Sequence, residues 1–303
     1  MGGVDRYSMM IIGKYFESVK DFKVVMMVSR KFNLLSEMYH FNPVPLTSLK
    51  ENKLFPNIET YHLYSKSDFD LEFPNKVIHY LMTYEDAIGL PQNIECTNVA
   101  FSREDVKLFG GEIPTSKEVQ SLSSSCFKSS TEQRCVVPQN IKVIGDECFS
   151  LSGKLHAISL SSNITVIPQR CFWGCRRLSA IENCRQILVV KDEAFSECNS
   201  LRDISIESVE ALGYHSFYQC KKLTSISFGS TLSSLGCGCF CECISLSEIT
   251  LPLKVTVLPK SCFADCSNLH TINGNITKYG SGALYNTQMN PTPLLRLAFR
   301  KAF

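Results

Sequence analysis

The densest group of reactive side chains in the sequence is a run of four cysteines within seven residues, Cys237, Cys239, Cys241 and Cys243. Cysteine thiolates bind zinc, so the run raises the question of a metal site. Zinc sites usually combine C-x₂₋₄-C pairs from two separate places in the chain, however. Cys239 and Cys243 also recur at fixed positions of a repeat, which leaves only Cys237 and Cys241 unexplained. The pattern therefore favours surplus cysteines, and we predict no metal ligands.

The remaining candidates for chemistry are equally sparse. None of the six histidines lies in a recognised catalytic motif: His40, His62, His79, His156, His215 and His270. His156 and His270 both follow the leading leucine of a repeat, a turn position that predicts solvated side chains. Gly236 and Gly238 are not followed by the Gly-Lys-Ser/Thr of a phosphate-binding loop. We therefore predict no catalytic residues and no cofactor, and we do not expect an enzyme.

The elements that position these residues come from a repeat of 22 or 23 residues. It is marked by seven phenylalanines, Phe127, Phe149, Phe172, Phe195, Phe217, Phe240 and Phe263. The stretches Leu223–Cys243 and Leu246–Cys266 agree at seven apolar positions, with mostly polar or small residues between them. A period of about 20–29 residues with leucines on a short strand is typical of a leucine-rich solenoid. One coil cannot bury its apolar face alone, so equivalent residues are expected to stack in ladders.

Ten of the 15 cysteines occupy two repeat positions, one residue before the phenylalanine or three residues after it. Ala194, Ser216 and Ala283 fill the first position in other coils, so this position requires a small residue. No signal peptide is recognisable at the N-terminus. Free thiols in these numbers then predict a reduced protein in the cytoplasm.

Charge and hydropathy argue against nucleic-acid binding and against a transmembrane segment. The sequence has 31 basic and 29 acidic residues, and a net charge of +2 gives no electrostatic case for nucleic acid. No segment has the ~18 uninterrupted apolar residues that indicate a transmembrane helix.

The pattern L-x-x-I-x-L-(P)-x-x-x-V-x-x-I-G-x-x-x/A-F-x-x-C, repeated from Ile113 to Thr287, resembles the BspA-like leucine-rich repeats (LRR_5 type) of bacteria and protists. This resemblance implies a curved solenoid. Its L-x-x-I-x-L strand would line one face, a second short strand at V-x-x-I another, and a helical turn would carry A-F-x-x-C. The predicted fold class is therefore α+β: a leucine-rich repeat solenoid with a small helical N-terminal cap.

In such a solenoid, the outward positions of the first strand in each coil are the candidates for binding a partner. The residues that we select there are Ser159, Glu182, Asp203, Ser205, Ser227, Glu248, Thr250 and Asn273. They are small, polar and of mixed charge, and they include none of the Trp, Tyr or Arg that dominate binding hot spots. We expect a non-enzymatic protein–protein interaction module with a protein ligand. The alternative that the resemblance implies is an adhesion protein displayed on the cell surface after export by a non-classical route.

Residues 1–50 do not carry the repeat. Apolar spacing predicts one helix over Tyr7–Phe16 and another over Phe22–Phe32, joined by a capped turn at Ser18–Asp21. The residue order resembles an F-box, and the positions that match as contacts are Ile12, Tyr15, Phe16, Phe22, Val28 and Phe32. The segment departs from that family at Ser18, where proline is usual, and it lacks the opening Leu-Pro. The resemblance implies docking of residues 1–45 onto a Skp1-like protein of a ubiquitin ligase, with the repeats selecting the substrate. The other interpretation is a helical cap that covers the first coil.

The rest of the chain connects or ends these parts. Residues 51–112 are expected to form a transitional region of strands and short helices packed on the first coil, with one strand within Phe55–Tyr64. The solenoid is assigned to residues 113–287. Residues 288–303 carry two prolines and then a basic amphipathic segment, which we predict to be a C-terminal capping tail.

Overall fold

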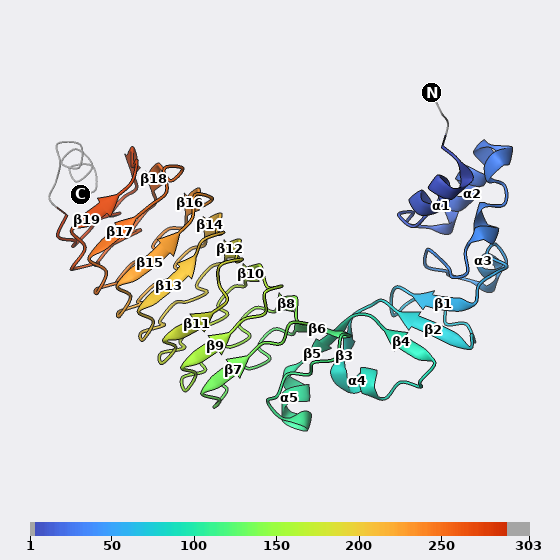
Figure 1. Ribbon diagram of the computed structural model, residues 1–303, viewed down its shortest axis with the longest axis horizontal. Helices are drawn as coiled ribbons and strands as arrows, with labels where there is room; N and C mark the ends of the chain where they lie inside the picture. Colours follow the sequence, from blue (N-terminus) through green and yellow to red (C-terminus); the bar gives the residue numbers. More distant parts are fainter. Residues whose placement is uncertain (1–3, 290–303) are drawn as a thin grey trace. The chain divides into compact units, whose positions relative to one another are not determined.

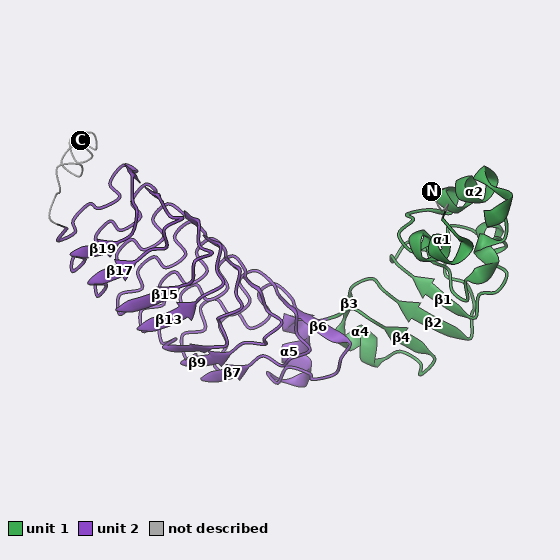
Figure 2. Ribbon diagram, turned by 45° about the horizontal axis from the view of Figure 1, so that its top comes forward, with its two compact units in different colours: residues 1–99 green, residues 100–303 purple. Residues whose placement is uncertain are grey.

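The computed structural model describes residues 4–289, and the chain divides into two compact units between residues 99 and 100 (Figures 1 and 2). The predicted capping tail at 288–303 therefore lies almost wholly outside the described residues. Within the described part, no helix has the length and apolar character to cross a membrane.

The first unit begins with short helices, whose bounds are α1 (Arg6–Gly13), α2 (Val19–Val28), the 3₁₀ turns η1 (Arg30–Phe32) and η2 (Leu35–Met38), and α3 (Leu49–Asn52). The two helices predicted here are present. The first is shorter than expected, and the second breaks at Ser29 before continuing as η1. The capped turn is confirmed, because Ser18 and Asp21 form a capping box at the start of α2. Gly13 is required at the end of α1, since a Cβ atom there would collide with the Tyr39 hydroxyl.

A small parallel sheet follows these helices. Its strands pair in the order β1 (Thr60–Leu63), β2 (Asn75–Ile78) and β4 (Ile94–Cys96), and β3 (Met82–Thr83), α4 (Tyr84–Ile88) and β5 (Val99–Phe101) lie between or after them. The predicted strand within Phe55–Tyr64 is confirmed as β1. The unit is held by buried aromatic rings in edge-to-face contact, with Phe22 in the centre, 5.5 Å from Tyr39 and 5.2 Å from Phe55 between ring centroids.

The second unit starts with α5 (Arg103–Phe109) and continues as the predicted solenoid, which is confirmed (Figure 1). Its first strands are β7 (Arg134–Val136), β9 (Ala157–Ser159), β11 (Ala180–Glu182), β13 (Asp203–Ile206), β15 (Ser225–Phe228), β17 (Glu248–Thr250) and β19 (Thr271–Asn273). Its second strands are β6 (Val119–Leu122), β8 (Val143–Ile144), β10 (Val166–Ile167), β12 (Val189–Val190), β14 (Ala211–Leu212), β16 (Ser234–Leu235), β18 (Val257–Leu258) and β20 (Lys278–Tyr279). Pairing is parallel and one repeat apart, as in Ile204 opposite Ile226.

The third side of each coil is a pair of consecutive turns around the marker phenylalanine. The residues two before and two after it have positive φ, for example 49° at His215 and 56° at Gln219 around Phe217. A helix cannot continue through such residues, so the expected helical turn does not extend into a helix. The N–H groups of His215, Phe217 and Gln219 instead donate to carbonyl groups of the next coil at 2.8–3.0 Å. Coils are therefore hydrogen-bonded to each other on all three sides.

The marker phenylalanines form a single column, as the spacing predicts. Successive rings from Phe127 to Phe263 are 5.1–5.5 Å apart between centroids, with interplanar angles of 5–17°. Near-parallel rings at these centroid distances fall within the favourable range for stacked aromatic pairs. The members are at most 4% exposed, so the column forms the core of the unit.

The cysteines three residues after the phenylalanine do more than fill space. The thiol of Cys220 donates to the Phe195 carbonyl of the preceding coil at 3.2 Å, and Cys175, Cys198, Cys243 and Cys266 repeat this contact at 3.0–3.3 Å. Ser152 makes the equivalent bond with its hydroxyl at 2.9 Å. This repeat position therefore holds a small donor, whereas the sequence had indicated a small side chain only for the position before the phenylalanine.

The column predicts the effect of shortening one member. Phe217→Ala should lower the free energy of unfolding by about 3–5 kcal/mol, because it opens a cavity between two neighbouring rings. Phe217→Leu is the matched control and should cost less, since Leu284 occupies the equivalent place in the last described coil. Urea denaturation followed by circular dichroism measures both. Equal stability of Phe217→Ala and the unchanged protein would contradict the placement of this residue in the core.

Candidate binding surface

The predicted binding residues lie on one continuous surface, the outer face of the first strands, which we call the strand face. Side chains alternate along each strand, so Ile204 is buried while its neighbours Asp203 and Ser205 point outward. Parallel pairing then places Asp203 beside Ser225 and Ser205 beside Ser227 in the next coil. Figure 1 shows these strands side by side from β7 to β19.

The eight residues selected from the sequence occupy this face as expected from the alternation. Six are exposed, and Ser159 and Ser205 are half-buried. Adjacent coils bring Ser159 beside Glu182 and Thr250 beside Asn273. Whether these residues contact a partner stays a prediction.

The chemistry of the strand face is polar and weakly acidic. Its hydroxyl and amide groups bond to one another: Asn273 Nδ2 donates to Thr250 Oγ1 at 3.4 Å, and Ser205 Oγ donates to Glu207 Oε1 at 3.2 Å. Glu182, Asp203 and Glu248 add exposed carboxylates in three coils. Such a surface can accept hydrogen bonds and attract cations, but the eight side chains offer no large apolar anchor.

Aromatic side chains that the sequence analysis missed gather on the turn side of the solenoid. Tyr214 and Tyr218 stack on the two sides of His215, with centroid distances of 3.8 and 4.8 Å. The Tyr218 hydroxyl donates to Glu242 of the next coil at 2.8 Å, which raises the pKa of this tyrosine to about 12. Tyr214 remains 46% exposed. The signal was available at Tyr214, because five other coils have a polar residue at this repeat position: Ser124, Asp146, Gln169, Asp192 and Lys260.

A second cluster that the sequence did not reveal lies on the sheet of the first unit. His62 on β1 and His79 after β2 face each other, with 3.0 Å between Nδ1 and Nε2. The Phe41 ring stacks on His62 at 4.5 Å, and the Tyr64 ring stacks on His79 at 5.0 Å. Burial, with a smaller contribution from His79, lowers the pKa of His62 to about 4. Burial also lowers the pKa of His79, so both rings are neutral at pH 7.

A hollow of about 430 Å³ adjoins this histidine pair. It is lined by the Phe41 and His62 rings and by polar groups that include Glu59, Asn75 and Glu95. Aromatic faces beside amide and carboxylate groups can hold a polar side chain of a partner. The hollow could not be predicted from the sequence, because its residues come from segments of the first unit that are distant in the chain.

Metal binding finds no support in residues 4–289, where no three His, Cys, Asp or Glu side chains come together in a metal-binding arrangement. In the cysteine run, Cys239 and Cys243 are buried ladder members, whereas Cys237 is exposed. The Cys243 thiol donates to the Phe217 carbonyl, and the Cys239 sulfur lies 3.7 Å from that of Cys262. Burial raises the pKa of both Cys239 and Cys243, which keeps these thiols protonated.

Comparison with known sequences identifies the repeat. A family profile described as a BspA type leucine rich repeat region matches residues 98–202 and 188–294, with six copies of the repeat. The chain belongs to this family. The resemblance of the repeats to the BspA-like family is thereby confirmed. No curated protein matches the chain.

Two solved structures share the fold of this BspA-type chain. The leucine-rich repeat protein of T. pallidum aligns with a TM-score of 0.54 and 24% identity, over 63% of this chain and 91% of that one. A leucine-rich repeat protein from Eubacterium ventriosum aligns with a TM-score of 0.50 and 15% identity, over 78% of each chain. A leucine rich cell surface protein from Faecalibacterium prausnitzii has a TM-score of 0.40 and 16% identity, over 55% of this chain and 62% of that one. At these identities the similarity concerns the fold alone.

The histidine pair predicts a pH dependence of the first unit. His62 has a pKa of about 4 in the folded chain and about 6.5 when unfolded, so the unfolded state binds more protons between these values. The stability of this unit should therefore fall as the pH drops from 6.5 towards 4. His62→Gln should reduce this loss, whereas His270→Gln in an exposed turn should leave it unchanged.

Hydrogen exchange of the β1 amides, followed by mass spectrometry at pH 7.5 and pH 5 after correction for intrinsic exchange rates, measures the effect. The same loss of protection in His62→Gln and in the unchanged protein would show that His62 does not cause it.

Proposed function

We propose that this chain is a non-enzymatic recognition module that binds another protein through the strand face. The observation that carries the proposal is the register of the first strands, which aligns outward polar side chains of consecutive coils on one continuous sheet. Repeat proteins use extended surfaces of this kind for binding. The family membership supports the same reading.

The charge on the strand face indicates which partner it suits. Glu182, Asp203 and Glu248 are exposed carboxylates spread along the sheet. Glu207 lies at the edge, where Arg185 pairs with it at 3.6 Å. A partner with lysine or arginine side chains at matching intervals would gain association rate and specificity from these groups. The packed ladders beneath the strand face hold its backbone in place. Binding a partner therefore costs little backbone conformational entropy.

Charge reversal on the face tests the proposal. Asp203→Lys combined with Glu248→Lys should abolish capture of the protein's partners from a cytoplasmic extract, because like charges at a binding surface repel. Glu210→Lys is the matched control, since this exposed carboxylate lies before β14, outside the strand face. Mass spectrometry of captured proteins compares the baits. Identical captured sets from both variants would contradict recognition through this face.

The same comparison separates the two compartments expected from the sequence. The proposal places the module in the cytoplasm, where its buried thiols remain reduced. Face-dependent capture from the cytoplasmic extract supports that placement. Face-dependent capture only from extracellular material would instead support the adhesion role.

A second candidate function, adaptor docking through the first two helices, is favoured by apolar side chains that they leave exposed. Tyr15, Met27 and Val28 are 77–83% exposed, and Ile11 and Ile12 of α1 are also exposed. Exposed apolar groups gathered on one short segment mark interaction sites more often than isolated ones. A Skp1-like protein is the partner that the F-box resemblance implies.

The structure narrows the residues that could serve this docking. Phe22 is fully buried and Phe32 is 8% exposed, so both support the core of the first unit. Phe16 is half-buried against the Phe22 ring. The contacts proposed for a Skp1-like partner are therefore Ile12, Tyr15 and Val28, with Phe16 at the edge.

A pull-down with a Skp1-like protein tests the adaptor function. Tyr15→Asp combined with Val28→Asp should abolish co-purification, because the charges would enter the apolar contact, while leaving the core intact. Leu81→Asp, at another exposed apolar residue of the same unit, should have no effect. Co-purification that survives the double substitution, or that never occurs with the unchanged chain, would rule out F-box-type docking.

A further inference from the structure

The sheet of first strands has an open edge at β7. The Val137 N–H donates to the Ser159 carbonyl at 2.8 Å, and the Ala157 N–H donates to the Gln133 carbonyl at 3.4 Å, so β7 bonds to β9 on one side. In a parallel strand, the N–H and C=O groups of one residue point to one side and those of the next residue to the other side. The N–H and C=O groups of Arg134 and Val136 therefore point away from β9. No hydrogen bond to these groups is found within residues 4–289. Such an edge can accept another strand.

The coil before β7 fails to supply that strand. Residues 111–113, one repeat earlier, form no strand, because α5 ends at Gly110 with φ of 90° and the chain continues through Gly111 without regular pairing. In addition, Glu132 stands where the following coils have a buried leading leucine such as Leu155. The leucine ladder therefore ends one coil early.

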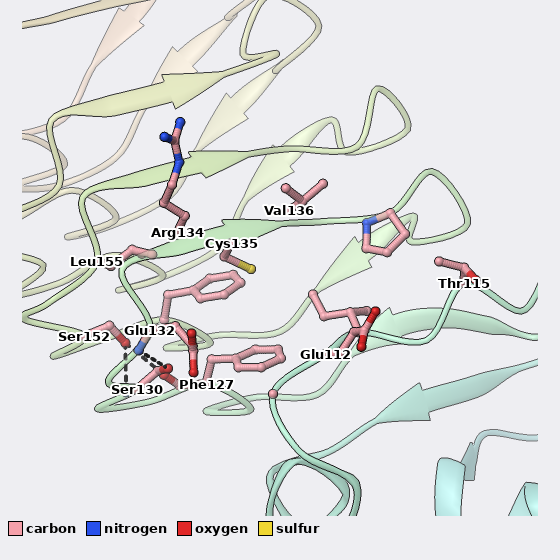
Figure 3. A pocket seen from close by; sticks show the side chains of 14 residues that line it. Glu112, Thr115, Phe127, Ser130, Glu132, Arg134, Cys135, Val136, Ser152 and Leu155 are labelled. Carbon is pink, nitrogen blue, oxygen red and sulfur yellow. Dashed lines mark hydrogen bonds between the residues drawn. The ribbon is translucent and has the colours of Figure 1, made fainter.

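These two gaps leave a cavity of about 450 Å³ (Figure 3). Its inner wall is apolar and includes Phe127, Phe149 and Leu155, and Cys135 of β7 faces it. A cavity of about 150 Å³ accommodates benzene, so this volume can take several apolar side chains. Val136, on the open edge, is 70% exposed.

One segment of this chain has the side-chain pattern that fits the gap. Residues 294–299 read L-L-R-L-A-F, with Leu294, Leu297 and Phe299 at the spacing of the core residues of β15, where Leu223, Ile226 and Phe228 stand. The segment lies in the C-terminal tail, outside the described residues.

Chain length prevents the tail from reaching β7 of its own molecule. Six strand-to-strand steps separate β7 from β19, which is roughly 29 Å at the usual strand spacing. Only four residues lie between Met289 and Leu294. The five Cα-to-Cα steps from Met289 to Leu294 span at most about 18 Å when fully extended. The tail of a second copy has no such restriction.

Charge also favours the tail as the occupant. Residues 290–303 contain Arg296, Arg300 and Lys301 and no acidic residue. Glu112 and Glu132 are exposed at the cavity, and Arg134 extends away from both of them (Figure 3). A basic strand entering here would meet two carboxylates.

We propose that residues 294–299 of one molecule add as a parallel strand to the open edge of β7 in a second molecule and insert their apolar side chains into the cavity beside it. The contact joins different surfaces of the two molecules, so it is head-to-tail and can continue beyond a dimer. Main-chain hydrogen bonds to Arg134 and Val136 give affinity, and the cavity selects the L-x-x-L-x-F pattern.

A fluorescent peptide spanning residues 290–303 tests the contact. It is titrated by anisotropy against the full chain carrying Leu297→Asp and Phe299→Asp, so that the chain's own tail does not compete. Val136→Pro removes the outward N–H without disturbing the bonds to β9, and it should weaken binding about tenfold. Val136→Thr keeps the N–H and should bind as the parent does. Thermal melts of both variants show that the fold is retained.

A second variant tests the cavity without changing the backbone. Glu132→Leu restores the missing ladder leucine and removes a carboxylate, so it should weaken peptide binding while the melting temperature is kept or raised. A peptide of the same composition in scrambled order should not bind. Equal binding of the scrambled peptide, or binding unaffected by both Val136→Pro and Glu132→Leu, would overturn the proposal.

The unchanged chain provides the final measurement. Sedimentation velocity at increasing concentration should show reversible association that Leu297→Asp abolishes. A chain that stays monomeric at every concentration would overturn the proposal.

Discussion

The second unit depends on hydrogen bonds between each coil and the next, made on three sides at once. Two sides are parallel strands, such as β13 with β15 and β14 with β16. The third consists of alternate N–H groups around the marker phenylalanine, which donate to the following coil at the same spacing. Together they fix a common rise per coil. Residues 22 or 23 positions apart must then lie in register, and the phenylalanine column, the cysteine donors and the strand face all follow from that register.

The third side carries a conformational cost that the register offsets. Among the described residues, fourteen non-glycine residues have positive φ, and all except Asn183 flank a column position. Each such residue costs roughly 1–2 kcal/mol relative to its preferred backbone conformation. The N–H of each flanking residue from Ser125 to Asp265 bonds to the next coil, so the strained backbone gains an intercoil hydrogen bond that a helix could not supply. Hydrogen bonding to the next coil therefore offsets the conformational cost of these flanking residues.

Periodicity predicted most of this architecture, because one repeated constraint determines many positions. The phenylalanine steps gave the column, and the leading leucines placed Asp203, Ser227 and Glu248 on the exposed face. Periodicity could not reveal interactions that are not repeated. The His62–His79 pair joins strands of different sequence, and the Tyr214–His215–Tyr218 stack occurs where the pattern permits any side chain. The donor role of Cys220 was also missed, since a thiol that fills space and a thiol that donates occupy the same sequence position.

Removal of one whole coil tests the register most directly. Deleting residues 223–245 joins Lys222 to Leu246, which restores the apolar template without a gap. The shortened chain should keep its β-type circular dichroism and unfold cooperatively at a somewhat lower urea concentration. Deleting residues 223–234, about half a coil, removes fewer residues but should abolish cooperative unfolding, because every later side chain then faces the wrong side. If the half-coil deletion proved as stable as the whole-coil deletion, register between coils would not be what holds this protein together.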